Sequence, residues 1–150
     1  MNGVPVDLTT ALLAWGDGRR ADLPWRATRD PWAVLVSETM LQQTQTSRVA
    51  PRYTAFLARF PTAAACAAAP AADILRAWAG LGYNRRALSL HRAAQAIVER
   101  HAGQVPDDLE ALLALPGVGP YTARAVLALA FEADHGVLDT NAARVLARAL

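Results

Sequence analysis

The sequence lacks lysine and contains a single cysteine. All 15 of its basic residues are arginine, so no lysine amine is available for covalent catalysis through a Schiff base. The one cysteine, Cys66, has no partner for a disulfide within the chain, which is usual for proteins of the cytoplasm. We therefore expect a cytoplasmic protein without disulfides of its own.

Long apolar runs are also absent. No stretch approaches the roughly 18 consecutive apolar residues that a membrane helix requires. Residues 1–10 lack the basic start and apolar stretch of a secretory signal. The sequence thus predicts that the protein has no membrane partner.

What is present is the composition of a globular protein. The 150 residues are 53% hydrophobic and 19% charged, which is enough to bury a core as one domain, residues 1–150, and we expect a monomer. The net charge of +2 is compatible with nucleic-acid binding but does not establish it.

Nearly every segment has the apolar spacing of a helix, and none alternates with period two between turn residues. The sequence therefore predicts an all-α fold. Asp30 followed by Pro31 is typical of a helix start, and Pro51 predicts the first turn of the next helix. Further helices are expected at residues 7–15, 71–79, 85–101, 107–115, 121–131 and from 141 onward.

The last residues, 147–150, fall inside a helical pattern that has no cap or breaker. We therefore expect that the domain is incomplete and that a longer protein has been cut here.

Pro116, Gly117, Val118 and Gly119 connect two amphipathic segments and predict a helical hairpin at about residues 109–131. The glycines allow a tight turn, and free N–H groups at the start of the next helix can bind a DNA phosphate without reading the bases. The alternative is an ordinary glycine-rich connection. The full string Leu-Pro-Gly-Val-Gly-Pro-Tyr-Thr-Ala, residues 115–123, resembles the helix-hairpin-helix of the endonuclease III superfamily of DNA glycosylases.

Glu38 lies in a predicted helix that is apolar on most of its circumference. Burial there would raise the pKa of its carboxyl group and let it hold a proton near neutral pH. The alternative is a glutamate on a thin exposed stripe. The polar run that follows, Gln42, Gln43, Thr44 and Gln45, suits insertion into a base stack.

The string Ser-Glu-Thr-Met-Leu-Gln-Gln-Thr-Gln, residues 37–45, closely resembles the signature of MutY-type adenine DNA glycosylases. The resemblance implies that Glu38 protonates the adenine and that Gln43 intercalates beside the lesion.

Asp139 precedes the last predicted helix, where aspartate is a common N-cap. In the superfamily that the hairpin resembles, the aspartate at this place stabilises the sugar cation. The resemblance therefore implies that Asp139 is the second catalytic carboxylate, and only the fold can bring it to Glu38.

Further strings match the same family, among them Leu23-Pro24-Trp25-Arg26 and Ala79-Gly80-Leu81-Gly82-Tyr83. The resemblance implies that Trp25, Arg26, Tyr121 and Asn141 line the adenine pocket or support the catalytic pair. It also implies that Tyr83 inserts near the damaged partner base. For Trp25 and Tyr83 the alternative is packing in the core or a loop. Asn84 departs from the family, which often has a second tyrosine there.

The resemblance implies a base excision repair enzyme. Its reaction would hydrolyse the N-glycosidic bond of adenine mispaired with 8-oxoguanine or guanine in double-stranded DNA. Relatives with lyase activity carry a lysine two residues after the last hairpin glycine, where this chain has Tyr121, so we expect a monofunctional glycosylase.

Full-length members of the family carry a [4Fe–4S] cluster on four cysteines. Cys66 alone cannot supply these ligands, and no other metal site is expected. We expect the isolated 150-residue chain to be unstable or inactive.

Three alternatives remain open: a mismatch thymine glycosylase of the same superfamily, a non-catalytic DNA-binding hairpin module, and a structural fragment of a truncated gene. Glu38 and the glutamine run favour adenine. An adenine leaving group benefits from protonation, whereas thymine can leave as an anion.

Overall fold

The computed structural model describes residues 6–17 and 22–149, which form helices joined by loops, with no strand among them. The expected all-α fold is confirmed. The chain divides into two compact units, one drawn from residues 1–23 and 138–150 and the other from residues 24–137. None of the helices in the described part of the chain is long and apolar enough to cross a membrane.

The larger unit contains every element from η1 to α8. Their bounds are η1 Pro24–Arg26, α2 Pro31–Leu41, α3 Thr46–Arg59, α4 Ala63–Ala68, α5 Ala71–Ala77, α6 Arg85–His101, α7 Leu109–Leu113 and α8 Pro120–Ala130. The smaller unit contains α1 Val6–Asp17 and α9 Thr140–Ala149.

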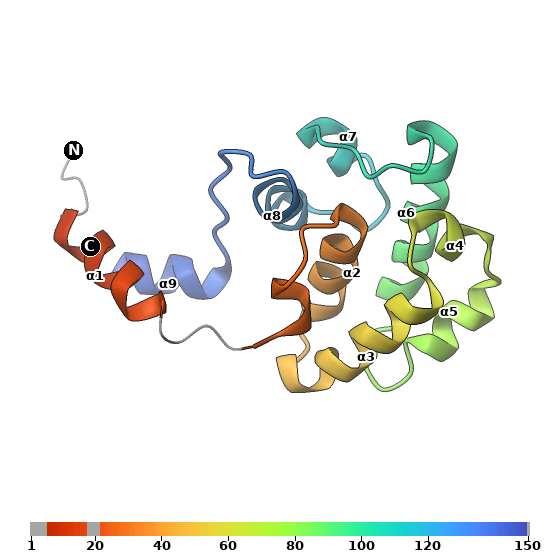
Figure 1. Ribbon diagram of the computed structural model, residues 1–150, viewed down its shortest axis with the longest axis horizontal. Helices are drawn as coiled ribbons and strands as arrows, with labels where there is room; N and C mark the ends of the chain where they lie inside the picture. Colours follow the sequence, from red (N-terminus) through yellow and green to blue (C-terminus); the bar gives the residue numbers. More distant parts are fainter. Residues whose placement is uncertain (1–5, 18–21, 150) are drawn as a thin grey trace. The chain divides into compact units, whose positions relative to one another are not determined.

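Helix α2 is the centre of the larger unit. It begins where the Asp30 carboxylate accepts a hydrogen bond of 3.0 Å from the Ala33 N–H, with Pro31 in the first turn, as its sequence predicts. Every residue from Trp32 to Met40 is buried, because α3, α6 and α8 pack around the helix (Figure 1). The helix that carries Glu38 is therefore a core element with little freedom to move.

Helix α6 forms the second long element of this unit. Helices α4 and α5 pack against it, and α4 consists almost entirely of alanine, so the two backbones can approach closely. At its C-terminus Ala102 adopts a left-handed conformation, and the Gly103 N–H donates to the Ile97 carbonyl at 3.1 Å. This is a standard way to end a helix.

Several expected helix boundaries are wrong. Pro51 is expected in the first turn of a helix, but α3 begins at Thr46 and Pro51 lies beyond its first turn. The proline is tolerated there because it removes only one backbone hydrogen bond. The helix expected at residues 71–79 ends at Ala77. The helix expected at residues 107–115 is shortened to α7, because the Asp108 side chain caps it by accepting from the Ala111 N–H at 2.9 Å.

The smaller unit has little core of its own. No residue of α9 is buried, and none of the described residues of α1 belongs to the core cluster. Among the residues of this unit whose side chains the structure describes, the large apolar ones that are at least 40% exposed are Leu12, Leu13, Trp15, Leu138, Val145 and Leu146.

Candidate active site and nucleic-acid interface

Glu38 lies in the last turns of α2 and is only 9% exposed. Burial raises the pKa of its carboxyl group above the ordinary value of 4.5. The hydroxyls of its neighbours Ser37 and Thr39 donate to the carbonyls one turn earlier, at 2.9 and 2.8 Å, so they do not stabilise the carboxylate. A buried carboxyl group that holds its proton in this way can act as a general acid. The expectation that Glu38 is buried is confirmed.

The loop that follows α2, residues 42–45, is here named the glutamine loop. Gln43 has a φ of 56° and its side chain is exposed. Thr44 closes the turn, since its N–H donates to the Leu41 carbonyl and its hydroxyl to the Gln42 carbonyl, both at 3.3 Å. A non-glycine residue in the left-handed region costs about 1 kcal/mol or more, and strain of this kind gathers at functional sites.

The loop between α5 and α6, residues 79–84, is here named the tyrosine loop. Gly80 and Gly82 have φ values of 90° and 72°, and Tyr83 also lies in the left-handed region, at 49°. Leu81 is buried and the Trp78 indole N–H donates to the Gly82 carbonyl at 3.2 Å, which anchors the loop. Tyr83 nevertheless remains 65% exposed. The loop thus holds an aromatic ring out toward solvent.

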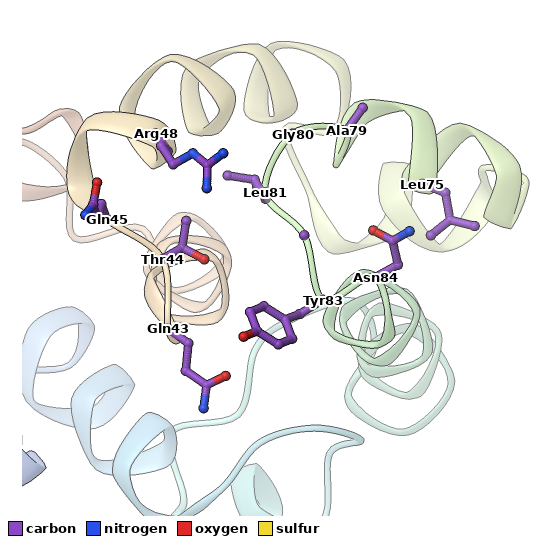
Figure 2. A pocket seen from close by; sticks show the side chains of 11 residues that line it. Gln43, Thr44, Gln45, Arg48, Leu75, Ala79, Gly80, Leu81, Tyr83 and Asn84 are labelled. Carbon is purple, nitrogen blue, oxygen red and sulfur yellow. The ribbon is translucent and has the colours of Figure 1, made fainter.

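The two loops line one open hollow of about 710 Å³. Figure 2 shows the Tyr83 ring reaching from one loop toward Gln43 and Thr44 of the other, with Arg48 of α3 farther along the same hollow. The full lining is Gln43, Thr44, Gln45, Arg48, Leu75, Ala79, Gly80, Leu81, Gly82, Tyr83 and Asn84. The structure therefore brings together Gln43, Thr44 and Tyr83. These residues come from two separate motifs, and the sequence predicted that they contact DNA.

The hairpin turn between α7 and α8 is pressed against α6. Gly117 has a φ of 78°, and a Cβ atom there would lie 2.6 Å from the Cβ of Ser89. Val118 is only 8% exposed and its N–H donates to the Leu115 carbonyl at 3.2 Å. These residues fix the turn by packing, and the half-buried Pro116 precedes them.

The start of α8 is the part of the hairpin that can receive an anion. Gly119 is the N-cap residue, and no side chain caps the helix. The first N–H groups of a helix have no partner within it, so they can bind a phosphate. Tyr121, at the second position of α8, is 42% exposed.

Trp25 and Arg26 form the end of η1. The Trp25 ring packs edge-on against Tyr53, with 5.7 Å between ring centroids and an interplanar angle of 85°, whereas Arg26 is exposed. Both η1 and α8 contact α2. Three predicted pocket residues, Trp25, Arg26 and Tyr121, therefore lie on elements that adjoin the helix of Glu38.

Asp139 caps α9, since its carboxylate accepts from the Ala142 N–H at 2.6 Å. The expected capping role is confirmed. Asn141 is exposed in the first turn of α9. Both residues belong to the smaller unit, and the pairing of Asp139 with Glu38 stays a prediction.

Two residues of the site were missed by the sequence analysis. Thr122 is buried in α8 and its hydroxyl oxygen accepts from the Gln42 side-chain amide at 3.2 Å, which ties the glutamine loop to the hairpin. Arg86, at the start of α6, contacts both loops. Neither residue has a local signal, because each acts on a segment far away in the sequence.

Cys66 does not fit an iron–sulfur cluster. It is buried in α4, and burial raises the pKa of its thiol to about 12, whereas a ligand must be a thiolate. Among the described residues no group of three or more His, Cys, Asp or Glu side chains could hold a metal ion.

A helix start able to receive a phosphate lies in one unit with a buried acid and two strained loops. These features define a class, the helix-hairpin-helix proteins, whose hairpin can bind the DNA backbone. Residues 36–150 match the model of the HhH-GPD superfamily base excision DNA repair protein. The chain belongs to this family.

Curated relatives agree with this membership. The chain is 52% identical over 140 residues to the adenine DNA glycosylase of Mycolicibacterium smegmatis, covering 93% of this chain and 48% of that protein. It is 43% identical over 147 residues to the adenine DNA glycosylase of Homo sapiens, covering 92% and 27%. The chain therefore spans about half the length, or less, of these relatives.

Solved structures share the fold. A thermostable thymine-DNA glycosylase superposes with a TM-score of 0.88 at 33% identity, covering 93% of this chain and 64% of that one. An endonuclease III in a non-covalent complex with DNA superposes with a TM-score of 0.74 at 25% identity, covering 79% and 56%.

Proposed function

We propose that the protein is a monofunctional adenine DNA glycosylase. It hydrolyses the N-glycosidic bond of adenine mispaired with 8-oxoguanine or guanine in duplex DNA. The observation that carries the proposal is Glu38: a buried carboxyl group with a raised pKa, one helical turn before a glutamine loop in which Gln43 is strained and exposed. The adenine glycosylases at 52% and 43% identity support the choice of base.

The mechanism begins with extrusion of the adenine from the duplex, which costs a few kcal/mol. The start of α8 holds backbone phosphates through its N–H groups, while Gln43 and Tyr83 insert where the base stack has opened. These contacts offset the cost of extrusion. Trp25, Arg26, Tyr121 and Asn141 line the pocket that receives the base or support the catalytic pair.

Glu38 then donates its proton to the adenine. The bond between the base and C1′ of the sugar breaks with both electrons going to the protonated base, which leaves as neutral adenine. Asp139 stabilises the positive charge that develops on the sugar. Water adds to C1′ and releases one proton to solvent, Glu38 regains a proton from solvent, and an abasic site remains.

Hydrolysis by water is supported by the absence of lysine. A lyase of this superfamily needs an amine at the position of Tyr121 to form a Schiff base. Borohydride added during turnover is therefore expected to trap no covalent adduct with DNA. We further propose that the protein acts in the cytoplasm, as a monomer, on double-stranded DNA that contains an adenine mispair.

The test is single-turnover adenine release by the full-length protein from 8-oxoguanine:adenine and guanine:adenine duplexes, with alkali to reveal abasic sites. Glu38→Gln is expected to reduce release by at least about a thousandfold while DNA binding persists. Glu99→Gln, an exposed glutamate of α6, is the matched control and should behave like the wild type.

A guanine:thymine duplex tests the nearest alternative. Release of thymine instead of adenine would assign the protein to the mismatch thymine glycosylases. DNA binding without release of either base, unchanged by Glu38→Gln, would indicate a non-catalytic hairpin module.

A further inference from the structure

Arg86 is the point at which the two loops and the end of α2 meet. It is the second residue of α6 and is partly buried. Its Nη1 donates to the carbonyls of Thr39 and Met40, each at 3.0 Å, and to the carbonyl of Gln42. Its Nη2 donates to the Thr44 hydroxyl oxygen at 3.0 Å and to the carbonyls of Gly82 and Leu81 at 3.2 and 3.4 Å.

The same guanidinium also contacts two aromatic rings. Its central carbon lies 5.5 Å from the centroid of the Tyr83 ring and 5.6 Å from that of Trp78. Both distances fall within the range of a cation–π interaction. The ring of Tyr83 is therefore held by the cation that also holds the backbone of the glutamine loop.

The chemistry of arginine accounts for this arrangement. The carbonyls of Thr39 and Met40 lie in the last turn of α2, where a cation stabilises the negative end of the helix. Acceptors on two loops require donors that point in two fixed directions, and a planar guanidinium supplies them while its central carbon lies over the two rings. A lysine ammonium is a compact point charge, so it cannot donate in two fixed directions and cover the aromatic rings at the same time.

The backbone of both loops needs such support. Gln43 and Tyr83 each occupy the left-handed region, so neither loop is in a conformation that its residues favour locally. Arg86 contacts the residue before and the residue after Gln43, and also the residue before Tyr83. It thereby anchors both strained positions to α2.

We propose that Arg86 is a positioning residue that acts through Gln43 and Tyr83. It fixes the separation of these two side chains on either side of the hollow, with the C-terminus of α2 as its anchor. This proposal rests on the proposed function, because it assumes that Gln43 and Tyr83 insert into a DNA duplex at a mispaired base.

The experiment replaces Arg86 with lysine in the full-length protein. This substitution keeps the positive charge and removes the planar guanidinium with its two sets of donors. Arg92→Lys is the matched control, because Arg92 is exposed on the same helix. One readout is the fluorescence of 2-aminopurine placed beside the mispair, which rises when the base unstacks. The other is the single-turnover rate constant of adenine release at saturating DNA. Arg86→Lys is expected to lower the rate constant by about ten- to hundredfold and to reduce the fluorescence rise, whereas Arg92→Lys changes neither.

A double-mutant cycle separates positioning from a merely structural role. In a Gln43→Ala/Tyr83→Ala background the side chains that Arg86 positions are gone, so Arg86→Lys should lower the remaining rate by less than about twofold. If the full loss persists in that background, Arg86 acts elsewhere and the proposal is overturned. An Arg86→Lys protein equal to the wild type in both readouts also overturns it.

The measurements are made well below the melting temperature of the least stable variant. If Arg86→Lys does not fold, Thr44→Val is the second test. It removes one acceptor of Arg86 and should reduce the fluorescence rise, and an unchanged rise would contradict the proposal. If the wild type distorts the DNA but releases no adenine, the proposed function fails while the fluorescence arm still decides the role of Arg86.

Discussion

The side-chain amide of Gln42 donates a hydrogen bond of 3.2 Å to the hydroxyl oxygen of Thr122, 80 positions further along the chain. Gln42 ends α2 and Thr122 lies in the first turn of α8. This contact joins the loop that we propose inserts into the base stack to the hairpin that we propose holds the phosphates. Insertion and backbone binding are therefore expected to be coupled mechanically.

Removing this contact tests the coupling. Thr122→Val deletes the acceptor with little change of shape, so we expect a loss of about 1 kcal/mol in the free energy of unfolding and a several-fold slower release of adenine. Urea unfolding and single-turnover kinetics measure the two effects. Thr122→Ser keeps the hydroxyl and should retain most of the rate. Equal behaviour of the two variants would show that the hydrogen bond is irrelevant.

Glu38 is expected to reduce stability. Its folded-state pKa is raised above 4.5 by burial, so the folded protein binds the proton more tightly than the unfolded chain. As pH rises from 4.5 toward the higher folded-state pKa, the unfolded state loses the proton first. The free energy of unfolding therefore falls over this range.

Glu38→Gln removes this penalty. We expect the variant to gain roughly 1 kcal/mol at neutral pH, a usual size for such changes, and to approach the wild type in stability below pH 4.5. Thermal unfolding across pH measures the difference. A destabilised Glu38→Gln protein at neutral pH would mean that the carboxylate is stabilised in the fold.

The strain at Gln43 can be separated from its side chain. Its φ of 56° suits glycine, so Gln43→Gly should be more stable than Gln43→Ala by about 1 kcal/mol. Both variants lack the inserting side chain, and both should release adenine more slowly than the wild type. Chemical denaturation and single-turnover assays give the two values. A Gln43→Ala protein as stable as Gln43→Gly would show that the loop relaxes without cost.

The hairpin offers a steric test. Gly117→Ala places a Cβ 2.6 Å from that of Ser89 at a φ of 78°, and we expect a loss of about 2–3 kcal/mol in the free energy of unfolding. Gly136→Ala is the matched control, because Gly136 has no positive φ and no atom lies within 4 Å of a Cβ there. Its stability should change by less than about 0.5 kcal/mol. Similar losses in both variants would contradict the packing of the hairpin turn on α6.

Local sequence determined several features of this protein. Asp30 and Pro31 start α2 because a capping carboxylate and a proline without an N–H suit the first turn. Gly117 marks the hairpin because a left-handed backbone favours glycine. The local pattern around Pro51 predicted the wrong start for α3, because a proline is tolerated inside a helix where one hydrogen bond can be lost.

Tertiary structure alone decided how the candidate site is held together. The pKa of Glu38 is raised because α3, α6 and α8 surround its helix, and no local pattern shows which helices will do so. Arg86 reaches the Thr39 carbonyl across 47 positions, and Gln42 reaches Thr122 across 80. Hydrogen bonds of this range depend on how distant helices pack. The sequence therefore pointed to the residues that we propose contact DNA, whereas the fold determined what holds them in place.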